Sequence, residues 1–289
     1  MALGRPTGLY DAYLFDLDGT IYLGDALLPG ARRLVTELRR REIPVRFLSN
    51  NPTKDPAQYA EKLGRLGLAT PVGDIANTVA TMTRWLLAHH PGATVFPIAE
   101  QPLVDAFAAA GIAMSDDPAQ IDVVVASYDR SFDYRKLQIA FDAIWYHRRA
   151  ILVATNPDRY CPFPGGRGEP DCAAVVAAIE ASTGVRCQQV VGKPDPSMVD
   201  EALSGLDVDP RRCLMVGDRL QTDIELALRA GMASALPLTG DATLDDVFAA
   251  PSGHRPTFVV ERVDQILPEA VWSDLGWTVE PASAGGGAA

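Results

Sequence analysis

An apolar run that ends in two acidic residues sets the first limit on how this chain folds. Residues 13–15 are Tyr-Leu-Phe, which predicts a buried strand, and Asp16 and Asp18 follow with Gly19 behind them. Nearby carboxylates repel each other and are costly to bury unless a cation neutralises them. Their hard oxygens suit Mg²⁺, and a carboxylate can also act as a nucleophile. A turn at a strand end is the alternative, because Asp and Gly are common in turns.

Composition limits the kind of protein this is. The chain has 289 residues, 47% of them hydrophobic, which is enough for one large or two ordinary domains. Its net charge of −11 argues against sequence-independent nucleic-acid binding, which needs a basic surface. No signal-peptide pattern and no apolar stretch of membrane-spanning length occurs. We therefore expect a cytoplasmic protein with neither a nucleic acid nor a membrane as partner.

The cysteines give no metal pattern. None of the four is paired as Cys-x-x-Cys, and the chain has only four histidines. A zinc site is therefore not expected, and the thiols are expected to be reduced and structural.

Apolar runs alternate with segments of helical spacing along most of the chain. This alternation predicts βα units and a mostly parallel sheet, so the fold class is α/β. The expected strands cover residues 13–15, 45–49, 95–98, 123–126, 150–154, 190–191, 214–216, 233–238 and 257–260.

The alternation starts again near residue 80, as though one α/β domain were interrupted by another. We expect a core domain from residues 1–79 and 188–270 and an inserted α/β domain from residues 80–187. A C-terminal segment, 271–289, follows, and its small residues from 281 onward predict disorder.

Four predicted strand ends of the core carry polar side chains. The first carries the two aspartates, the second Ser49-Asn50-Asn51, the third Lys193, and the fourth Asp218 with Asp223 close behind. Ligands of open α/β sheets bind at the carboxyl edge, so these loops are expected to meet there. For residues 49–51 alone, a Ser- and Asn-rich turn is an equally good explanation.

Together these four motifs resemble the haloacid dehalogenase superfamily of phosphohydrolases, over about residues 10–265. They stand in the family's order, and the segments 154–158 and 217–224 are similar to its 4-nitrophenylphosphatase-like branch. Within that branch the chain looks closest to the bacterial sugar-phosphate phosphatases. The resemblance implies a Rossmann-like parallel-sheet core with a large inserted α/β cap.

The resemblance also implies roles for the acidic residues. Asp16 would attack phosphorus and become an aspartyl-phosphate, while Asp18 would protonate the leaving alcohol and then deprotonate water. Asp16, the backbone carbonyl of Asp18, and Asp218 would hold Mg²⁺. Asp223 would orient that shell.

The remaining motif residues would hold the phosphoryl group. By resemblance these are Gly19, Ser49, Asn50 through its amide, Asn51 and Lys193. A lysine suits this task independently, because a carboxylate approaches a phosphate dianion only when positive charge offsets the repulsion.

The cap is expected to read the leaving group. Asn156 and Asp158, after the strand at 150–154, are candidates to hydrogen-bond sugar hydroxyls, although an ordinary strand-ending turn explains them equally well. Residues 160–168 are expected to form a loop that contributes Tyr160 or Arg167.

Two aromatic residues in the cap leave alternatives open. Trp145 and Tyr146 fit core packing or a dimer face, and aromatic residues are favoured at such faces. A homodimer is expected by resemblance alone.

The leading hypothesis is a Mg²⁺-dependent phosphatase for a small phosphorylated metabolite, a sugar or polyol phosphate. One alternative is a phosphotransferase or mutase of the same superfamily, although mutases usually carry a smaller, helical cap. The other is a catalytically silent phosphosugar-binding regulator, although such relatives usually lose an acid that is present here.

Overall fold

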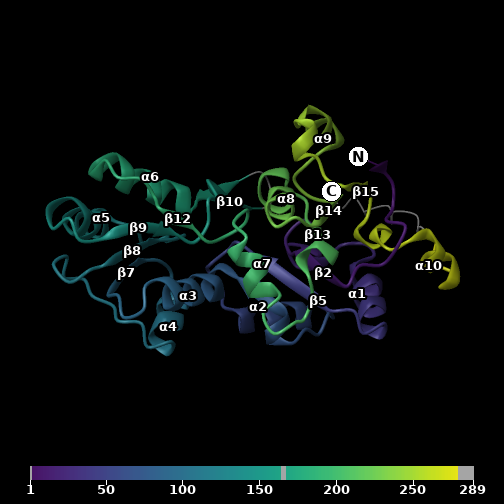
Figure 1. Ribbon diagram of the computed structural model, residues 1–289, viewed down its shortest axis with the longest axis horizontal. Helices are drawn as coiled ribbons and strands as arrows, with labels where there is room; N and C mark the ends of the chain where they lie inside the picture. The colour runs from purple at the N-terminus through teal and green to yellow at the C-terminus, as the bar shows by residue number, and fades with distance from the viewer. Residues whose placement is uncertain (1, 164–166, 279–289) are drawn as a thin grey trace, which may run out of the picture.

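The computed structural model describes residues 2–163 and 167–278. Two lobes lie side by side in Figure 1: both ends of the colour scale lie in the right-hand lobe, and the teal middle of the chain forms the left-hand lobe. The second α/β unit is therefore inserted into the first, as the restart of the sequence pattern predicts. The tail from residue 281, for which we predict disorder, lies outside the described residues.

The larger lobe is built on a seven-stranded, all-parallel sheet. Its strand order is β1-β15-β14-β13-β2-β5-β6, so β2 lies between β13 and β5 near the centre. The strands are β1 (Ala2–Leu3), β2 (Ala12–Asp16), β5 (Val45–Ser49), β6 (Ile75–Asn77), β13 (Cys213–Val216), β14 (Ala233–Pro237) and β15 (Phe258–Val260).

Side-chain alternation along β2 explains why helices cover both faces of this sheet. Tyr13 and Phe15 pack with residues of α1 (Ala31–Arg40) and α2 (Pro56–Arg65). Leu14 points to the other face and packs with α7 (Ser197–Ala202) and α8 (Glu225–Arg229). Burying both faces leaves the carboxyl ends of the strands as the edge where polar side chains gather.

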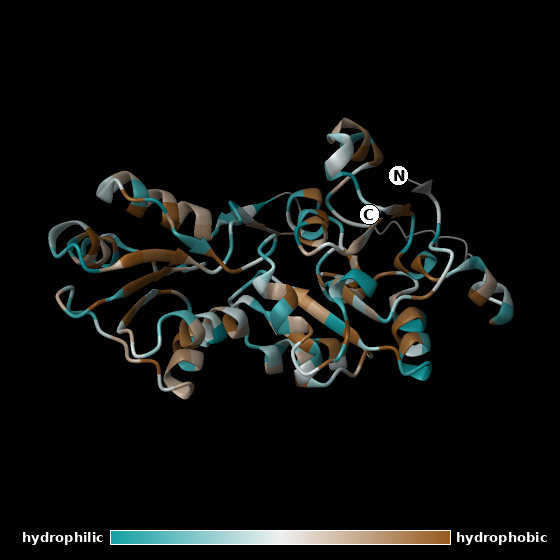
Figure 2. Ribbon diagram, viewed as in Figure 1, coloured by the Kyte–Doolittle hydropathy of each residue, from teal (hydrophilic) through white to brown (hydrophobic). Residues whose placement is uncertain are grey.

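The smaller lobe, here called the cap, repeats this architecture. Its sheet has four parallel strands in the order β12-β9-β8-β7: β7 (Val95–Ile98), β8 (Val123–Ala126), β9 (Ile151–Ala154) and β12 (Gln189–Val190). These strands are mostly hydrophobic (Figure 2). β12 lies beyond residue 187, where the sequence suggests that the inserted domain ends.

Helices also cover both faces of the cap sheet. One face packs with α5 (Tyr134–Phe141), a π-helical turn (Asp142–Tyr146) and α6 (Cys172–Thr183). The other packs with α3 (Thr78–His89) and α4 (Gln101–Ala109). α3 also contacts α7, so this helix joins the cap to the core on one side.

The prediction of a loop over residues 160–168 is wrong at its two ends. β10 (Tyr160–Pro162) and β11 (Gly168–Pro170) pair in an antiparallel hairpin. Strands of three residues are too short to show a period-2 pattern, so no periodic signal predicts them.

Short elements complete the fold. These are a small hairpin of β3 (Tyr22–Leu23) and β4 (Ala26–Leu27), α9 (Leu244–Ala249) and α10 (Glu269–Asp274). Within residues 2–163 and 167–278, no helix combines the length and the apolar character needed to cross a bilayer.

The exposure of two aromatic side chains in the cap rules out one of the two explanations offered for them, which is packing in the core. Trp145 is 54% and Tyr146 69% exposed, so core packing does not explain them. Trp145 stacks on Phe141 with ring centroids 5.1 Å apart.

Candidate active site

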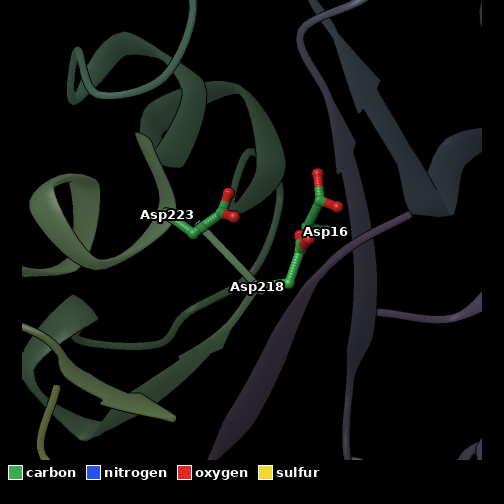
Figure 3. A group of neighbouring side chains, drawn as sticks. All are labelled: Asp16, Asp218 and Asp223. Carbon is green, nitrogen blue, oxygen red and sulfur yellow. The ribbon is translucent and has the colours of Figure 1, made fainter. Parts of the chain in front are cut away.

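Three carboxylates converge at the carboxyl edge of the core sheet. Asp16 ends β2, Asp218 follows the adjacent strand β13, and Asp223 lies in the π-helical turn Leu220–Ile224. Each residue contributes one carboxylate oxygen, and these three oxygen atoms all lie within 4.8 Å of one another. Figure 3 shows the three side chains meeting, Asp16 from β2 and the other two from the stretch that follows β13. The edge rule therefore correctly brings these residues together.

Lys193 supplies positive charge in this cluster. Its ammonium ion-pairs with Asp16 and lies 2.8 Å from Asp223 Oδ1, and the residue is only 2% exposed. Burial opposes the lysine's charge, but the two carboxylates outweigh it and raise its pKa. Burial in turn raises the pKa of Asp16, which Lys193 counteracts.

The oxygens of Asp218 and Asp223 differ in what they contact. Asp218 Oδ2 accepts a hydrogen bond of 2.7 Å from the Asp241 amide, whereas its buried Oδ1 has no hydrogen-bond partner among the described residues. Asp223 uses both oxygens, one toward Lys193 and the other toward the Arg219 amide at 3.1 Å.

This arrangement fits a hard divalent cation. An unpartnered buried carboxylate oxygen is costly unless a cation binds it, and oxygen ligands suit Mg²⁺. Burial, reinforced by the neighbouring Asp223, raises the pKa of Asp218 to about 6, and additional positive charge at the site would act in the opposite direction. The unpartnered oxygen of Asp218 and the partly exposed Asp16 are the available ligands. Asp223 already contacts Lys193 and the Arg219 amide.

Glycines make the room that the acids occupy. A Cβ on Gly19 would lie 2.4 Å from Asp218 Oδ2, and one on Gly240 would lie 1.9 Å from the same atom. A Cβ on Gly217 would lie 2.3 Å from Asp223 Cγ. Gly19 also has a φ of +85°, which disfavours other residues.

Asp18 lies outside the carboxylate cluster. Its side chain is exposed, and Asp18 Oδ2 accepts a hydrogen bond of 3.1 Å from the Tyr22 hydroxyl. The turn after β2 thus gives the two acids of the first motif different surroundings.

The second motif surrounds a tyrosine that the sequence does not single out. The Ser49 hydroxyl donates to Tyr59 Oη at 3.0 Å and accepts from the Asn51 amide at 3.3 Å. Tyr59 in turn donates to the Asn51 carbonyl at 3.2 Å. Tyr59 appears in the sequence only as an apolar position of α2, so no local pattern distinguishes it.

Asn50 joins the second and third motifs. Its Oδ1 accepts from the Lys193 amide at 2.7 Å, and its Nδ2 donates to the Lys193 carbonyl at 3.0 Å. The side chain thereby fixes the backbone that carries the lysine.

The cap candidates have protein partners. Asn156 is 1% exposed and donates to Asp158 at 2.9 Å and to Asp171 at 3.0 Å. Asp158 also accepts from Asn50 of the core at 2.9 Å.

The hairpin of β10 and β11 faces the second motif. Asn51 Nδ2 lies 3.7 Å from Cys161 Sγ, and Cys161 is the cross-strand partner of Glu169. Opposed residues of a hairpin share a face, so Glu169 lies on the side turned toward the core, where it accepts a hydrogen bond from Tyr128. Of the two alternatives predicted to contribute from this segment, Tyr160 is 55% exposed, and Arg167 is exposed as well.

Comparison with known proteins supports the superfamily that the four sequence motifs resemble. A family model for haloacid dehalogenase-like hydrolases matches residues 13–113, and a HAD-hydrolase-like model matches residues 190–266. The acid sugar phosphatase of Staphylococcus aureus is 34% identical over 261 residues, which cover 90% of this chain and 98% of that protein.

The chain belongs to the haloacid dehalogenase superfamily.

Two solved structures place this family member among phosphatases. The 4-nitrophenylphosphatase of Thermotoga maritima matches with a TM-score of 0.83 and 31% identity, over 89% of this chain and 96% of that one. Glycerol phosphate phosphatase of Mycobacterium tuberculosis, solved in complex with magnesium, matches with a TM-score of 0.81 and 30% identity, over 89% and 77%. The protein is a phosphatase of the 4-nitrophenylphosphatase-like branch.

The crowding around Asp218 predicts the effect of one added methyl group. Gly240→Ala should displace the Asp218 carboxylate from its bond to the Asp241 amide and lower 4-nitrophenyl phosphate hydrolysis by about tenfold or more. Gly253→Ala is the matched control, because a Cβ there meets nothing within 4 Å. Steady-state kinetics on both variants checks this, and equal activities would contradict it.

Proposed function

We propose that this phosphatase hydrolyses a sugar or polyol phosphate in a Mg²⁺-dependent reaction that passes through an aspartyl-phosphate at Asp16. The observation that carries the proposal is the cluster of Asp16, Asp218 and Asp223, two of which pair with one buried lysine, with Asp18 standing apart from the cluster. This pattern supplies a nucleophile, a charge-neutralising group and a separate acid–base group.

The first half-reaction follows from these positions. An Asp16 carboxylate oxygen attacks phosphorus, and the bond between phosphorus and the leaving oxygen breaks with its electron pair on that oxygen. Asp18 donates its proton to the leaving oxygen, so the product departs as a neutral alcohol. Lys193 offsets the repulsion between the attacking carboxylate and the phosphoryl oxygens.

The second half-reaction reverses the role of Asp18. Now ionised, Asp18 takes a proton from a water molecule whose oxygen attacks phosphorus. The bond between phosphorus and Asp16 breaks, which restores the carboxylate and releases inorganic phosphate. The Tyr22 hydroxyl, bonded to Asp18, holds the acid in position through both steps.

The residues present fit a resident cation. Asp16, the backbone carbonyl of Asp18, and Asp218 would hold Mg²⁺, which when bound would offset the negative charge of the phosphoryl group. Asp223 would orient these ligands through Lys193 and the backbone that follows Asp218. The magnesium in the mycobacterial glycerol phosphate phosphatase supports this assignment.

The second motif would hold the phosphoryl oxygens beside Lys193. Ser49 ends β5, the strand that pairs with β2 beside Asp16, so the candidates are Ser49, the amide of Asn50, Asn51 and the backbone at Gly19. Tyr59 fixes this loop through Ser49 and Asn51, so the donors are pre-positioned.

A polar leaving group is supported from two sides. The relatives are named for sugar phosphates and glycerol phosphate. On the cap, Glu169 lies opposite Cys161 in the hairpin and accepts a hydrogen bond from Tyr128, and these polar groups would offer hydrogen-bond partners to the hydroxyl groups of a leaving alcohol. The four-stranded cap also counts against the mutase alternative, which expects a smaller, helical one.

We further propose a homodimer that forms through the cap. The exposed Trp145 and Tyr146 lie together after α5, and large aromatic side chains are favoured at such interfaces.

Removing the nucleophile tests the mechanism. Asp16→Asn should lower turnover by about a thousandfold or more, because an amide does not form the acyl phosphate. The protein should stay folded, since Lys193 keeps Asp223. Asp25→Asn, an exposed acid on the β3–β4 turn, is the control that keeps wild-type activity. Hydrolysis at the wild-type rate by folded Asp16→Asn protein would contradict the covalent mechanism.

The dimer proposal has its own measurement. Analytical ultracentrifugation should give the wild-type protein twice the chain mass and a variant with Trp145→Ser and Tyr146→Ser the chain mass. Phe248→Ser, which changes a 47% exposed aromatic residue on the core, should stay dimeric. A monomeric wild type, or a dimeric double variant, would rule this interface out.

A further inference from the structure

We propose that Asp158 is a positioning residue that latches the cap onto the core and, in doing so, completes the phosphate site. The proposal rests on the proposed phosphatase function and assigns Asp158 a different task from contact with sugar hydroxyls. Its evidence is that one cap carboxylate contacts two separate catalytic loops of the core.

The two contacts use different oxygens of Asp158. Oδ2 accepts a hydrogen bond from Asn50 Nδ2 at 2.9 Å, and Oδ1 lies 3.5 Å from a terminal guanidinium nitrogen of Arg219. Asn50 follows β5, and Arg219 follows β13, on either side of β2. The side chain of Asp158 is only 13% exposed, so these contacts are largely shielded from water.

The cap holds this carboxylate rigidly. Asn156 Nδ2 donates to Asp158 Oδ2 at 2.9 Å and to Asp171 Oδ1 at 3.0 Å. The Asp158 carbonyl accepts from the Ala173 amide in the first turn of α6 at 3.0 Å. The carboxylate is therefore fixed to the cap and moves only when the cap moves.

Asn50 carries the effect of the latch to the lysine. Its amide nitrogen has two hydrogens, and its two partners are Asp158 and the Lys193 carbonyl. Its oxygen accepts from the Lys193 amide. Asp158 thus fixes the amide plane that positions the lysine backbone, and Lys193 pairs with Asp16.

Arg219 carries the effect to the acids. It directly follows Asp218, and its backbone amide donates to Asp223 Oδ2 at 3.1 Å. Asp16 and Asp218 also lie near enough to act on its charge, but its other ion pair among the described residues is with Asp241, which is 4.0 Å away and 58% exposed and so a weaker partner than Asp158. Loss of Asp158 would leave a half-buried arginine next to the candidate cation site.

We take a second contact between the cap and the core as the hinge. There α3 packs on α7, and Arg84 pairs with Glu201 at 2.8 Å. Because Asp158 belongs to the cap, and Asn50 and Arg219 to the core, a rotation of the cap about this contact would separate Asp158 from both of them. Closure of the cap and assembly of the phosphate site are therefore one event.

Kinetics with two substrates distinguish a latch from a substrate contact. Asp158→Ala should lower kcat/KM by about ten- to hundredfold for 4-nitrophenyl phosphate, whose leaving group has no sugar hydroxyls, and by the same factor for glycerol phosphate. Asp158→Asn, which keeps an acceptor for Asn50 but loses the charge facing Arg219, should fall between wild type and alanine. Asp116→Ala, which removes an exposed acid paired within the cap, is the control that keeps full activity.

Small-angle X-ray scattering without substrate gives a readout that does not depend on turnover. Asp158→Ala should have a larger radius of gyration than wild type, while Asp116→Ala should not. Loss of activity toward glycerol phosphate alone with unchanged scattering would overturn the latch in favour of substrate contact, and unchanged kinetics would also overturn it. A wild-type protein that releases no phosphate would instead refute the proposed function, and the scattering comparison would still test the latch.

Discussion

A buried lysine between two carboxylates is the interaction on which the active site depends. Three acids within 4.8 Å of one another repel, and Lys193, at 2% exposure, pairs with Asp16 and Asp223 and supplies positive charge that offsets this repulsion. The chain reaches Lys193 directly after β12, the last strand of the cap sheet. The lysine ammonium on which the core site depends therefore lies on the chain segment that leaves the cap, so the cap and the site are coupled through the backbone.

Packing fixes the acids as firmly as charge does. Gly19, Gly217 and Gly240 leave the space that the Asp218 and Asp223 side chains fill, and a methyl group at any of them would overlap a carboxylate. The acids are thus held in place before substrate arrives, which reduces the reorganisation needed as charge develops in the reaction. The unpartnered oxygen of Asp218 remains the costly exception, and the proposed cation would remove that cost.

The sequence predicts those parts of the site that depend on strand ends. Asp16, Ser49 and Asp218 could be grouped because parallel strands bring their carboxyl ends to one edge. The contacts of Asp158 could not be predicted, since they depend on how two domains dock and leave no periodic signal. The β10–β11 hairpin was missed for another reason: three-residue strands are too short to show alternation.

Release of inorganic phosphate from a panel of phosphate esters, with Mg²⁺ and again with a chelator, tests the account most directly. The panel would include sugar and polyol phosphates, phosphoglycolate, nucleotides and pyridoxal phosphate. We predict release from a few related sugar or polyol phosphates, lost on chelation and restored by added Mg²⁺. Release that persists with the chelator would contradict the assignment of Asp16, Asp18 and Asp218 as a metal site. No release from any ester by folded protein would contradict the phosphatase itself.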